Sequence, residues 1–367
     1  MKDKVSIIVP YHNSRKWIER LIDSMKAQSH TDFECIMVDD GGTDGTFELV
    51  EEVTRNDERF RNLKRPSHVS PGGRGAKNHG FSMSNAGFIV FFDSDDVMYP
   101  DYLSGRIGYL QENPGKDGVV SDFGWRVRPG EKKRVYRYNR RLFEDFRSNV
   151  RQDWFWLNYM DYRFWFNPGN PMWRRSSIAD KPLWDVTTAI GEDHEYHARL
   201  MLSGLDIGIL EGVHWDYMAN DESMIATSES ITPLLSRSHG KMLVLENLMA
   251  HLGLRKELVR KEFTCQVKLL RRIMACDAYP EEKRKAVDVM MSRIERTMEL
   301  MGYPIPKRAL VRYGLRTVTE WHAKTGRAHR LYSLMARDHR PTDENAFFRI
   351  SETNASSWPS PKPTSRT

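Results

Sequence analysis

Three aspartates stand within four positions, directly after a run of five bulky apolar residues. The apolar run covers residues 88–92, and Asp93, Asp95 and Asp96 follow it. A continuous run of this length, rich in β-branched and aromatic residues, is typical of a central strand that is covered on both faces. Carboxylates packed this closely repel one another, and a hard divalent cation shared with a diphosphate would relieve that repulsion. The alternative is a turn in which an aspartate caps the next helix.

A second predicted strand also ends in acids. Residues 34–38 are mainly apolar, and Asp39 and Asp40 follow them directly. Residues 5–9 predict a first strand, which Pro10 should close because proline lacks the amide that a continuing strand would donate. Open α/β sheets bind their ligands at the carboxyl ends of their strands, so two acidic strand ends predict a cleft at one sheet edge. For Asp39 alone, a helix or turn cap is the simpler interpretation.

The loop at residues 70–80 combines glycines with the cations Arg74 and Lys77. A flexible backbone that carries cations can approach a phosphate closely, whereas the alternative is a surface loop with ordinary solvated cations. The loop contains neither a Gly-Lys-Ser/Thr sequence nor a Gly-x-Gly-x-x-Gly sequence between strand and helix. This argues against P-loop and dinucleotide-binding proteins.

Tryptophans are concentrated in the middle of the chain. They are Trp154, Trp156, Trp165, Trp173 and Trp184. Aromatic rings stack on sugars or bases, but they also fill cores, and the core is the expected place for most of these five. Trp173, beside two arginines, is the candidate for contact with an acceptor.

Two further acids, Glu192 and Asp193, open a helix predicted to begin near residue 191. Acids in a first helical turn are also favoured by the helix dipole, so a purely structural role is a real alternative for both. His214 follows a short strand predicted at 207–210. A single histidine in such a place is more often packed in a core than bound to a metal.

The composition is that of a globular protein with an ordinary core. The chain has 367 residues, 40% of them hydrophobic, and a net charge of +6. No apolar run approaches the length needed to cross a bilayer, and the amino terminus is too short for a signal peptide, so we expect a cytoplasmic protein that is at most peripheral to a membrane. Three cysteines without paired spacing predict neither disulfides nor a structural zinc site.

The sequence changes character near residue 230. Helices are predicted at 234–254, 256–275, 280–301 and 307–335, with few strand signals, so a helical region is expected at 229–345 after a catalytic domain at 1–228. The segment 307–340 contains nine basic residues and only two acidic ones. This excess of positive charge predicts contact with a membrane surface or a nucleic acid, although a solvated helix face is commoner. The tail at 346–367, rich in Ser, Pro and Thr, is expected to be disordered.

Five motifs together resemble the family 2 glycosyltransferases of GT-A fold over roughly residues 4 to 225. They are VSIIVPYHN at 5–13, VDDGGTDGT at 38–46, AKNHG at 76–80, FFDSDD at 91–96 and GED at 191–193. The resemblance implies an α/β protein whose Rossmann-like mixed sheet is flanked by helices, with the helical region as an appendage. It also implies a nucleoside diphosphate sugar donor, with a UDP-sugar favoured, a Mn²⁺ or Mg²⁺ cofactor, and inversion at the anomeric carbon.

The resemblance also implies roles for individual residues. Pro10, Tyr11 and Asp39 fall where the family holds the base, Asp93 where it approaches the ribose, Asp95 where it binds the metal, and Asp193 on the catalytic base. We assign Asn13, Asp40, Arg74, Lys77 and Ser94 to the donor site as well, His214 as a further metal ligand, and Glu192 with Trp173 to the acceptor. Two positions depart from the common pattern: Lys77 stands where many relatives have arginine, and Gly42 where many have serine.

The predicted reaction follows from these residues. A metal at Asp95 would neutralise the leaving diphosphate, and Asp193 would take the proton of an acceptor hydroxyl from the opposite face. The favoured acceptor is a glycan or lipid-linked intermediate in surface polysaccharide or cell-wall synthesis. The alternatives are a nucleic-acid acceptor and a protein that binds nucleotide sugars without catalysis. A sugar nucleotidyltransferase is disfavoured, because no Gly-rich, Arg- and Lys-bearing turn follows the first strand.

Overall fold

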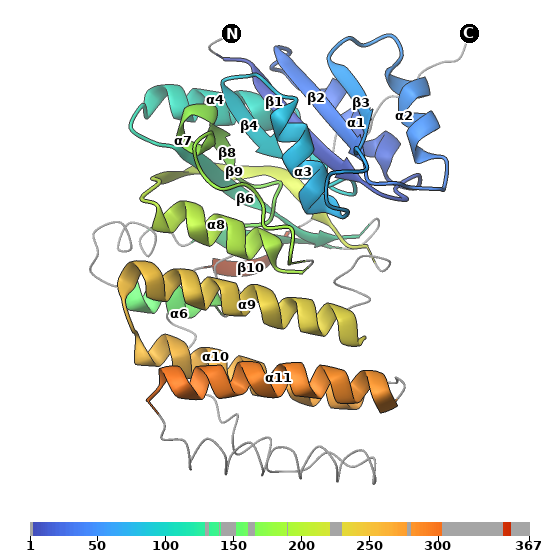
Figure 1. The fold of residues 1–367 in the computed structure, drawn as a ribbon. Helices are drawn as coiled ribbons and strands as arrows, with labels where there is room; N and C mark the ends of the chain where they lie inside the picture. Colours follow the sequence, from blue (N-terminus) through green and yellow to red (C-terminus); the bar gives the residue numbers. More distant parts are fainter. Residues whose placement is uncertain are drawn as a thin grey trace.

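The fold is described from a computed structural model of the 367-residue chain. The described residues are 3–128, 132–138, 140, 152–160, 166–188, 190–220, 230–276, 280–302 and 348–353. Figure 1 shows a sheet with helices packed against it and a stack of long helices beneath it. The α/β fold class is therefore confirmed.

A parallel four-strand unit forms the amino-terminal half of the sheet. Its strands are β4 (Phe88–Phe91), β1 (Val5–Tyr11), β2 (Phe33–Asp39) and β3 (Phe60–Lys64), in this spatial order. The connecting helices are α1 (Ile18–Lys26), α2 (Thr46–Thr54) and α3 (Gly73–Ser82). β1 is buried along its whole length, as its apolar sequence predicts. Because these strands are parallel, their carboxyl ends lie at one edge of the sheet.

β1 does not end at Pro10, contrary to the expectation, but continues to Tyr11 in register with β2. Ile8 accepts a hydrogen bond from Phe92 on the β4 side, and Tyr11 accepts one from Asp40 on the β2 side. In a central parallel strand, successive residues form their hydrogen bonds with one neighbouring strand and then the other. The N–H group that Pro10 lacks would therefore point toward β4. β4 has already ended there, and no strand hydrogen bond is lost.

Antiparallel and mixed pairings extend the sheet on the other side of β4. The further elements are β5 (Val97–Met98), α4 (Tyr102–Glu112), β6 (Gly118–Val127), β7 (Lys133–Tyr138), α6 (Gln152–Met160), β8 (Met172–Arg174), α7 (Arg175–Ile178), α8 (Glu192–Leu202) and β9 (Ile207–Met218). β8 is inserted between β4 and β6, and β9 pairs with both β5 and β6. The chain segments after β4 and before α8 are thereby brought to the edge where β1, β2 and β4 end.

Three long helices form the carboxyl-terminal part of the described chain: α9 (Ile231–Leu252), α10 (Lys256–Ala275) and α11 (Pro280–Leu300). They agree closely with three of the predicted helices. α9 packs against α8 and α10, and α11 packs against α10 (Figure 1). Because α9 lies directly on α8, the division at residue 228 into separate domains stays a prediction. None of the described helices is both long and apolar enough to span a membrane.

Two expectations concern the end of the chain. The fourth predicted helix at 307–335 and the basic segment 307–340 lie outside the described residues. The expectation of a disordered tail is wrong for six residues, because Phe348–Thr353 forms β10, which pairs antiparallel with β7 at the sheet edge. β7 offers a row of unpaired backbone groups on that side, and an added strand satisfies them.

Candidate functional site

Three chain segments that are distant in sequence meet at the carboxyl edge of the parallel strands. Lys77 of α3 has its Nζ 3.9 Å from Asp93 Oδ1, just after β4, and 3.8 Å from Glu192 Oε1, at the start of α8. The hydroxyl groups of Ser14 and Ser94 are hydrogen bonded at 2.9 Å, which joins the segment after β1 to the same acidic turn. Predicted site residues of α3, of the turn after β4 and of the start of α8 are thus brought together, with Ser14 beside them.

Lys77 is the cation at the centre of this site. Its side chain is only 3% exposed, and its ammonium lies 4.2 Å from the centre of the Trp184 ring. The distances to Asp93 and Glu192 are too long for direct hydrogen bonds, and within the described part of the chain Nζ forms none. A buried ammonium normally has its N–H groups paired, so three available donors beside these acids indicate a site for an anion.

Asp95 and Asp96, in the acidic turn after β4, differ in burial and in their hydrogen-bond partners. Asp96 is fully buried, and its Oδ1 accepts a hydrogen bond of 2.9 Å from the amide of Met218 at the end of β9. Asp95 is only partly buried and accepts a hydrogen bond from Asn220. Burial and the neighbouring Asp93 raise the pKa of Asp95 to about 6. Asp96 therefore anchors the turn, while Asp95 is a carboxylate whose charge is poorly compensated.

This arrangement fits a hard divalent cation bound in part by the substrate. Mg²⁺ and Mn²⁺ prefer oxygen ligands, and Mg²⁺ commonly takes one or two carboxylates together with substrate phosphates. Asp95, with Asp93 beside it, supplies such oxygens next to the Lys77 cation. Among the residues described, no three acidic, histidine or cysteine side chains form a complete metal cage. The remaining ligands would have to be phosphate oxygens or water.

α8 presents its two acids at its amino-terminal end. The helix begins after Gly191, whose φ of 86° is a left-handed conformation that favours glycine. Burial raises the pKa of Glu192 to about 7, although the nearby Lys77 opposes the shift. Asp193 is partly exposed, and its Oδ1 accepts a hydrogen bond of 2.8 Å from the amide of His194. The two adjacent acids therefore sit in different environments, and the Asp193 side chain is open to solvent in part.

The residues predicted to hold the base form a compact group at the ends of β1 and β2. Tyr11 is buried and donates a hydrogen bond of 2.6 Å to Asn62, and Asp39 accepts one of 2.9 Å from the amide of Gly42. Asn13 has a φ of 49° and accepts a hydrogen bond from Thr43. A side chain at Gly42 would bring its Cβ within 3.1 Å of Asp39 Oδ1. A Cβ there would require Asp39 or Asn13 to shift by a few tenths of an ångström. The contact of Pro10, Tyr11 and Asp39 with a base stays a prediction.

Two of the remaining donor-site assignments differ in outcome. Arg74 lies beside the site, where Nη2 is 3.3 Å from the carbonyl oxygen of Pro71 and 3.5 Å from that of Val186. Asp40 instead forms an ion pair with Arg65 and accepts hydrogen bonds from the amide of Gly72. Its carboxylate is occupied by these partners, so the structure gives Asp40 a structural role in place of donor binding.

The assignment of His214 as a metal ligand is wrong. Its Nδ1 lies 3.0 Å from Asp101 Oδ2, and its Nε2 lies 2.8 Å from the carbonyl oxygen of Glu211. The carbonyl of His214 pairs with the amide of Tyr99, four residues beyond Asp95. His214 is a packed histidine beside α4.

The assignment of Trp173 to acceptor binding is also wrong. Trp173 lies in the internal strand β8 and is 0% exposed. A Cβ at Gly118 would come within 2.6 Å of its ring, which shows how tightly β6 packs against it. Trp156 and Trp184 are buried as well, as expected for most of the tryptophans, whereas the side chain of Trp154 and all of Trp165 lie outside the described part.

Sequence analysis missed two contributors to the site. Trp184 covers the Lys77 ammonium, and Arg20 of α1 donates a hydrogen bond of 2.7 Å from Nη2 to the backbone carbonyl of Asp95. The sequence marks Trp184 only as one aromatic residue among five. Arg20 carries no local signal, because it is 75 residues from the carbonyl that it binds.

Comparison with known proteins agrees with this geometry. Residues 6–169 match the sequence description of glycosyl transferase family 2. This part of the chain is a family 2 glycosyltransferase domain. The match ends before α8 and the helical region, so the roles of Glu192 and Asp193 rest on the geometry and on the resemblance of their motif.

Two curated relatives and one solved structure illustrate the similarity. An uncharacterized glycosyltransferase of Rickettsia felis is 34% identical over 110 residues, which are 30% of this chain and 18% of that protein. TuaG of Bacillus subtilis, a glycosyltransferase assigned to teichuronic acid biosynthesis, is 32% identical over 111 residues, 30% of this chain and 43% of that protein. The matched stretches thus span less than half of these relatives.

The structure of residues 1–349 of TarS from S. aureus, in complex with UDP-GlcNAc, is similar over 89% of this chain and 93% of that chain. The TM-score is 0.56 at 18% sequence identity. This similarity establishes the GT-A fold and extends beyond the glycosyltransferase domain, over most of the present chain.

Proposed function

We propose that the protein is an inverting glycosyltransferase that moves a sugar from a nucleoside diphosphate donor to a hydroxyl group of an acceptor. The observation that carries the proposal is the buried Lys77 ammonium, which forms no direct hydrogen bond with any described residue and lies between Asp93 and Glu192. Three unused N–H donors next to a cluster of acids suit a ligand that brings both negative charge and a metal ion, as a diphosphate does.

The donor site uses residues from four segments. Tyr11 and Asp39 would contact the base, Asp93 and Ser94 the ribose side, and Lys77 with Arg74 the diphosphate. Asp95 would hold Mg²⁺ or Mn²⁺, which supplies Lewis-acid stabilisation of the departing phosphate oxygen. Lysine acts on phosphate as a point charge and lacks the bidentate fork of arginine. This site should therefore tolerate more variation in phosphate geometry than one built on arginine.

The transfer step can be written in terms of the chain's own residues. The bond between the anomeric carbon and the phosphate oxygen breaks, and the acceptor oxygen forms a bond with the same carbon from the opposite face. The acceptor proton passes to the Asp193 carboxylate, which lies in the first turn of α8 and is partly exposed. Glu192, with its raised pKa, lies beside Lys77 and would contact the sugar.

A UDP-sugar donor and a bacterial surface glycan as acceptor are the favoured substrates. TarS was solved with UDP-GlcNAc, and TuaG bears the name of teichuronic acid biosynthesis, which supports a glycan acceptor over a nucleic acid. The curated relatives match only 30% of this chain, so the acceptor is the part of the proposal that rests least on them.

A donor screen tests the proposal. UDP- and GDP-sugars are incubated with the full chain and a divalent cation, and the released nucleoside diphosphate is measured. We expect slow hydrolysis of at least one donor, and at least tenfold weaker nucleoside diphosphate binding by Lys77→Met. Lys116→Met is the matched control, because Lys116 is also a largely buried lysine but pairs with Asp206 away from the site. No hydrolysis of any donor, or equal binding by Lys77→Met and wild type, would contradict the proposal.

A further inference from the structure

Trp184 lies between the Lys77 cation and the body of α8. One face of its indole ring is 4.2 Å from the Lys77 ammonium, and the ring stacks on Tyr196 of α8 with 4.2 Å between ring centroids and 16° between planes. Trp184 is 2% exposed. The ring is therefore fixed in place and presents its negative face to a cation that has little water around it.

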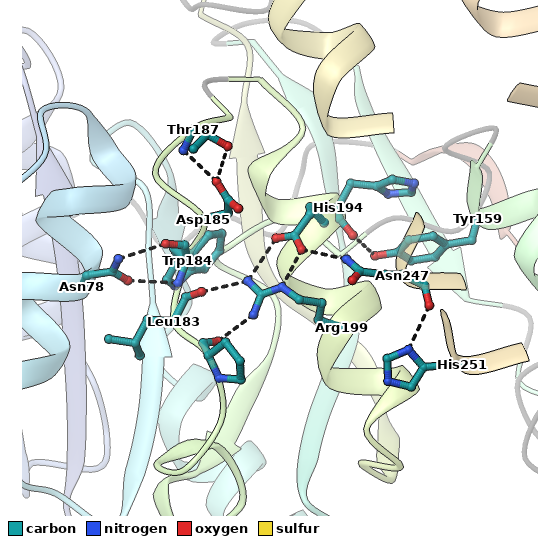
Figure 2. A network of polar contacts seen from close by, with 12 residues as sticks. Asn78, Tyr159, Leu183, Trp184, Asp185, Thr187, His194, Arg199, Asn247 and His251 are labelled. Atoms are coloured by element: carbon teal, nitrogen blue, oxygen red, sulfur yellow. Dashed lines mark hydrogen bonds and ion pairs between the residues drawn. The ribbon is translucent and has the colours of Figure 1, made fainter. Parts of the chain in front are cut away.

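The backbone of Trp184 is clamped by α3. Asn78, next to Lys77 in the sequence, donates from Nδ2 to the carbonyl oxygen of Trp184 at 2.9 Å and accepts from the amide of Trp184 at 3.0 Å. Figure 2 shows this pair of hydrogen bonds between the Asn78 side chain and Trp184. The same turn of α3 thus supplies both the cation and the clamp that holds the ring over it.

Arg199 of α8 holds the residues just before Trp184. It donates from Nη1 to the carbonyl oxygen of Pro182 and from Nη2 to that of Leu183, each at 2.8 Å. The guanidinium also forms a two-hydrogen-bond ion pair with the buried carboxylate of Glu195, one turn earlier in the helix. Because the planar Arg199 guanidinium binds a carboxylate and two carbonyl oxygens at once, the backbone of residues 182–184 has little freedom to shift.

The helical region joins this network through Asn247 of α9. Asn247 donates to Glu195 Oε1 at 3.1 Å, so the carboxylate that orients Arg199 is itself held from α9. Figure 2 shows these hydrogen bonds: Asn247 donates to the carboxylate that Arg199 also binds, and Arg199 donates to the carbonyl oxygen of Leu183, the residue before Trp184. A continuous path of direct contacts therefore runs from α9 to Lys77.

We propose that Trp184 is a positioning residue that holds the Lys77 ammonium away from Asp93 and Glu192, and that Arg199, Glu195 and Asn247 keep Trp184 in place. The ammonium is almost equidistant from the two carboxylates and hydrogen bonded to neither. Attraction to the ring competes with a direct ion pair, which would consume the donors needed for a diphosphate. This inference rests on the proposed function, and it makes α9 part of the donor site.

Binding of UDP and of uridine to the full chain separates this role from a merely structural one. Replacing the ring by Trp184→Leu should weaken UDP binding about fivefold to thirtyfold, the usual worth of a desolvated cation–π contact. Uridine binding, which involves no phosphate, should stay within about twofold. Trp184→Phe keeps an aromatic face and should recover most of the loss. If GDP binds more tightly than UDP, GDP and guanosine take their places.

A double-mutant cycle with Lys77→Met is decisive. If Trp184 acts through Lys77, Trp184→Leu should cost no further UDP affinity once Lys77→Met is present, whereas general damage to the site would add to it. Additive losses, or an equal loss of uridine affinity, would overturn the inference. If Lys77→Met loses UDP affinity and Trp184→Leu does not, the role given to Trp184 is wrong but the proposed function stands. If Lys77→Met loses no UDP affinity, the proposed role of Lys77 is wrong as well.

Arg199→Lys extends the test to the outer part of the network, and replaces Trp184→Leu if that variant does not fold. It keeps the charge but loses the fork on Glu195 and the two carbonyl oxygens. We expect a threefold to tenfold weaker affinity for UDP but not for uridine, on the order of one ordinary hydrogen bond. Arg59→Lys, which disturbs the comparable Arg59–Asp57 pair away from the site, is the matched control and should leave both affinities unchanged. Equal effects of the two substitutions would overturn the role given to Arg199.

Discussion

The backbone amide of Gly72 donates to both carboxylate oxygens of Asp40, at 2.7 and 3.0 Å. Arg65 binds the same carboxylate through Nε and also donates to the carbonyl oxygen of Val69. The end of β2 is thereby tied to the loop that leads into α3. Since α3 carries Lys77, the Asp40 contacts fix the place from which the cation reaches the site.

Asp40→Asn should destabilise this connection. The substitution removes the ion pair and leaves one oxygen for two donors, which typically costs about 1–3 kcal/mol. We expect the free energy of unfolding in urea to fall by that amount, with weaker UDP binding because α3 is less well placed. Asp57→Asn, which breaks the pair with Arg59, should lower stability without changing UDP affinity. Unchanged stability of Asp40→Asn would contradict the structural role.

The sheet edge at which the site forms was predictable from the sequence, but the role of each acid at that edge was not. Asp39 and Asp93 were expected at one sheet edge because apolar strands of this kind pair in parallel, and they do end there. Adjacent residues at a strand end point in different directions. Which of Asp39 and Asp40 is engaged internally depends on Arg65, 25 residues further along the chain, and no local pattern shows that.

Trp173 and His214 show a second limit. Trp173 lies in a strand of only three residues, too short for periodicity to reveal, and its burial results from insertion of that strand between β4 and β6. His214 lies in a long strand, but its place relative to Asp95 depends on the antiparallel register of β9 with β5. Pairing partners and registers of this kind are set by tertiary contacts.

Asp193→Asn should separate binding from turnover. The amide keeps the shape of the side chain but is a far weaker base than a carboxylate, so the acceptor proton has no efficient destination. We expect kcat for transfer to fall about a hundredfold or more, while the Kd for UDP stays within about twofold. Single-turnover transfer and calorimetric titration give the two quantities. An equal loss in both would assign Asp193 to binding or folding.

Glu192 should make stability depend on pH in a defined window. Burial raises its pKa in the folded protein from 4.5 to about 7, so the protonated form stabilises the folded state. That contribution is complete below pH 4.5 and is lost as the pH rises to about 7. Glu192→Gln stays neutral, so its stability relative to the wild type should rise by on the order of 2–3 kcal/mol between pH 4.5 and 7.5. Urea unfolding at several pH values measures this, and a constant difference would contradict the raised pKa of Glu192.

Asp95 should govern metal binding, with His214 as an internal control. A carboxylate must be ionised to bind a cation, and the pKa of Asp95 is about 6, so Mn²⁺ affinity in the presence of UDP should fall about tenfold per pH unit below that value. Asp95→Asn should abolish both Mn²⁺ binding and donor hydrolysis. His214→Gln should leave Mn²⁺ affinity within about twofold, because both ring nitrogens already lie within hydrogen-bonding distance of Asp101 and Glu211. Equilibrium dialysis gives the affinities, and hydrolysis is followed with and without EDTA. Full activity in excess EDTA, or a loss of Mn²⁺ binding by His214→Gln equal to that of Asp95→Asn, would contradict this assignment of the metal site.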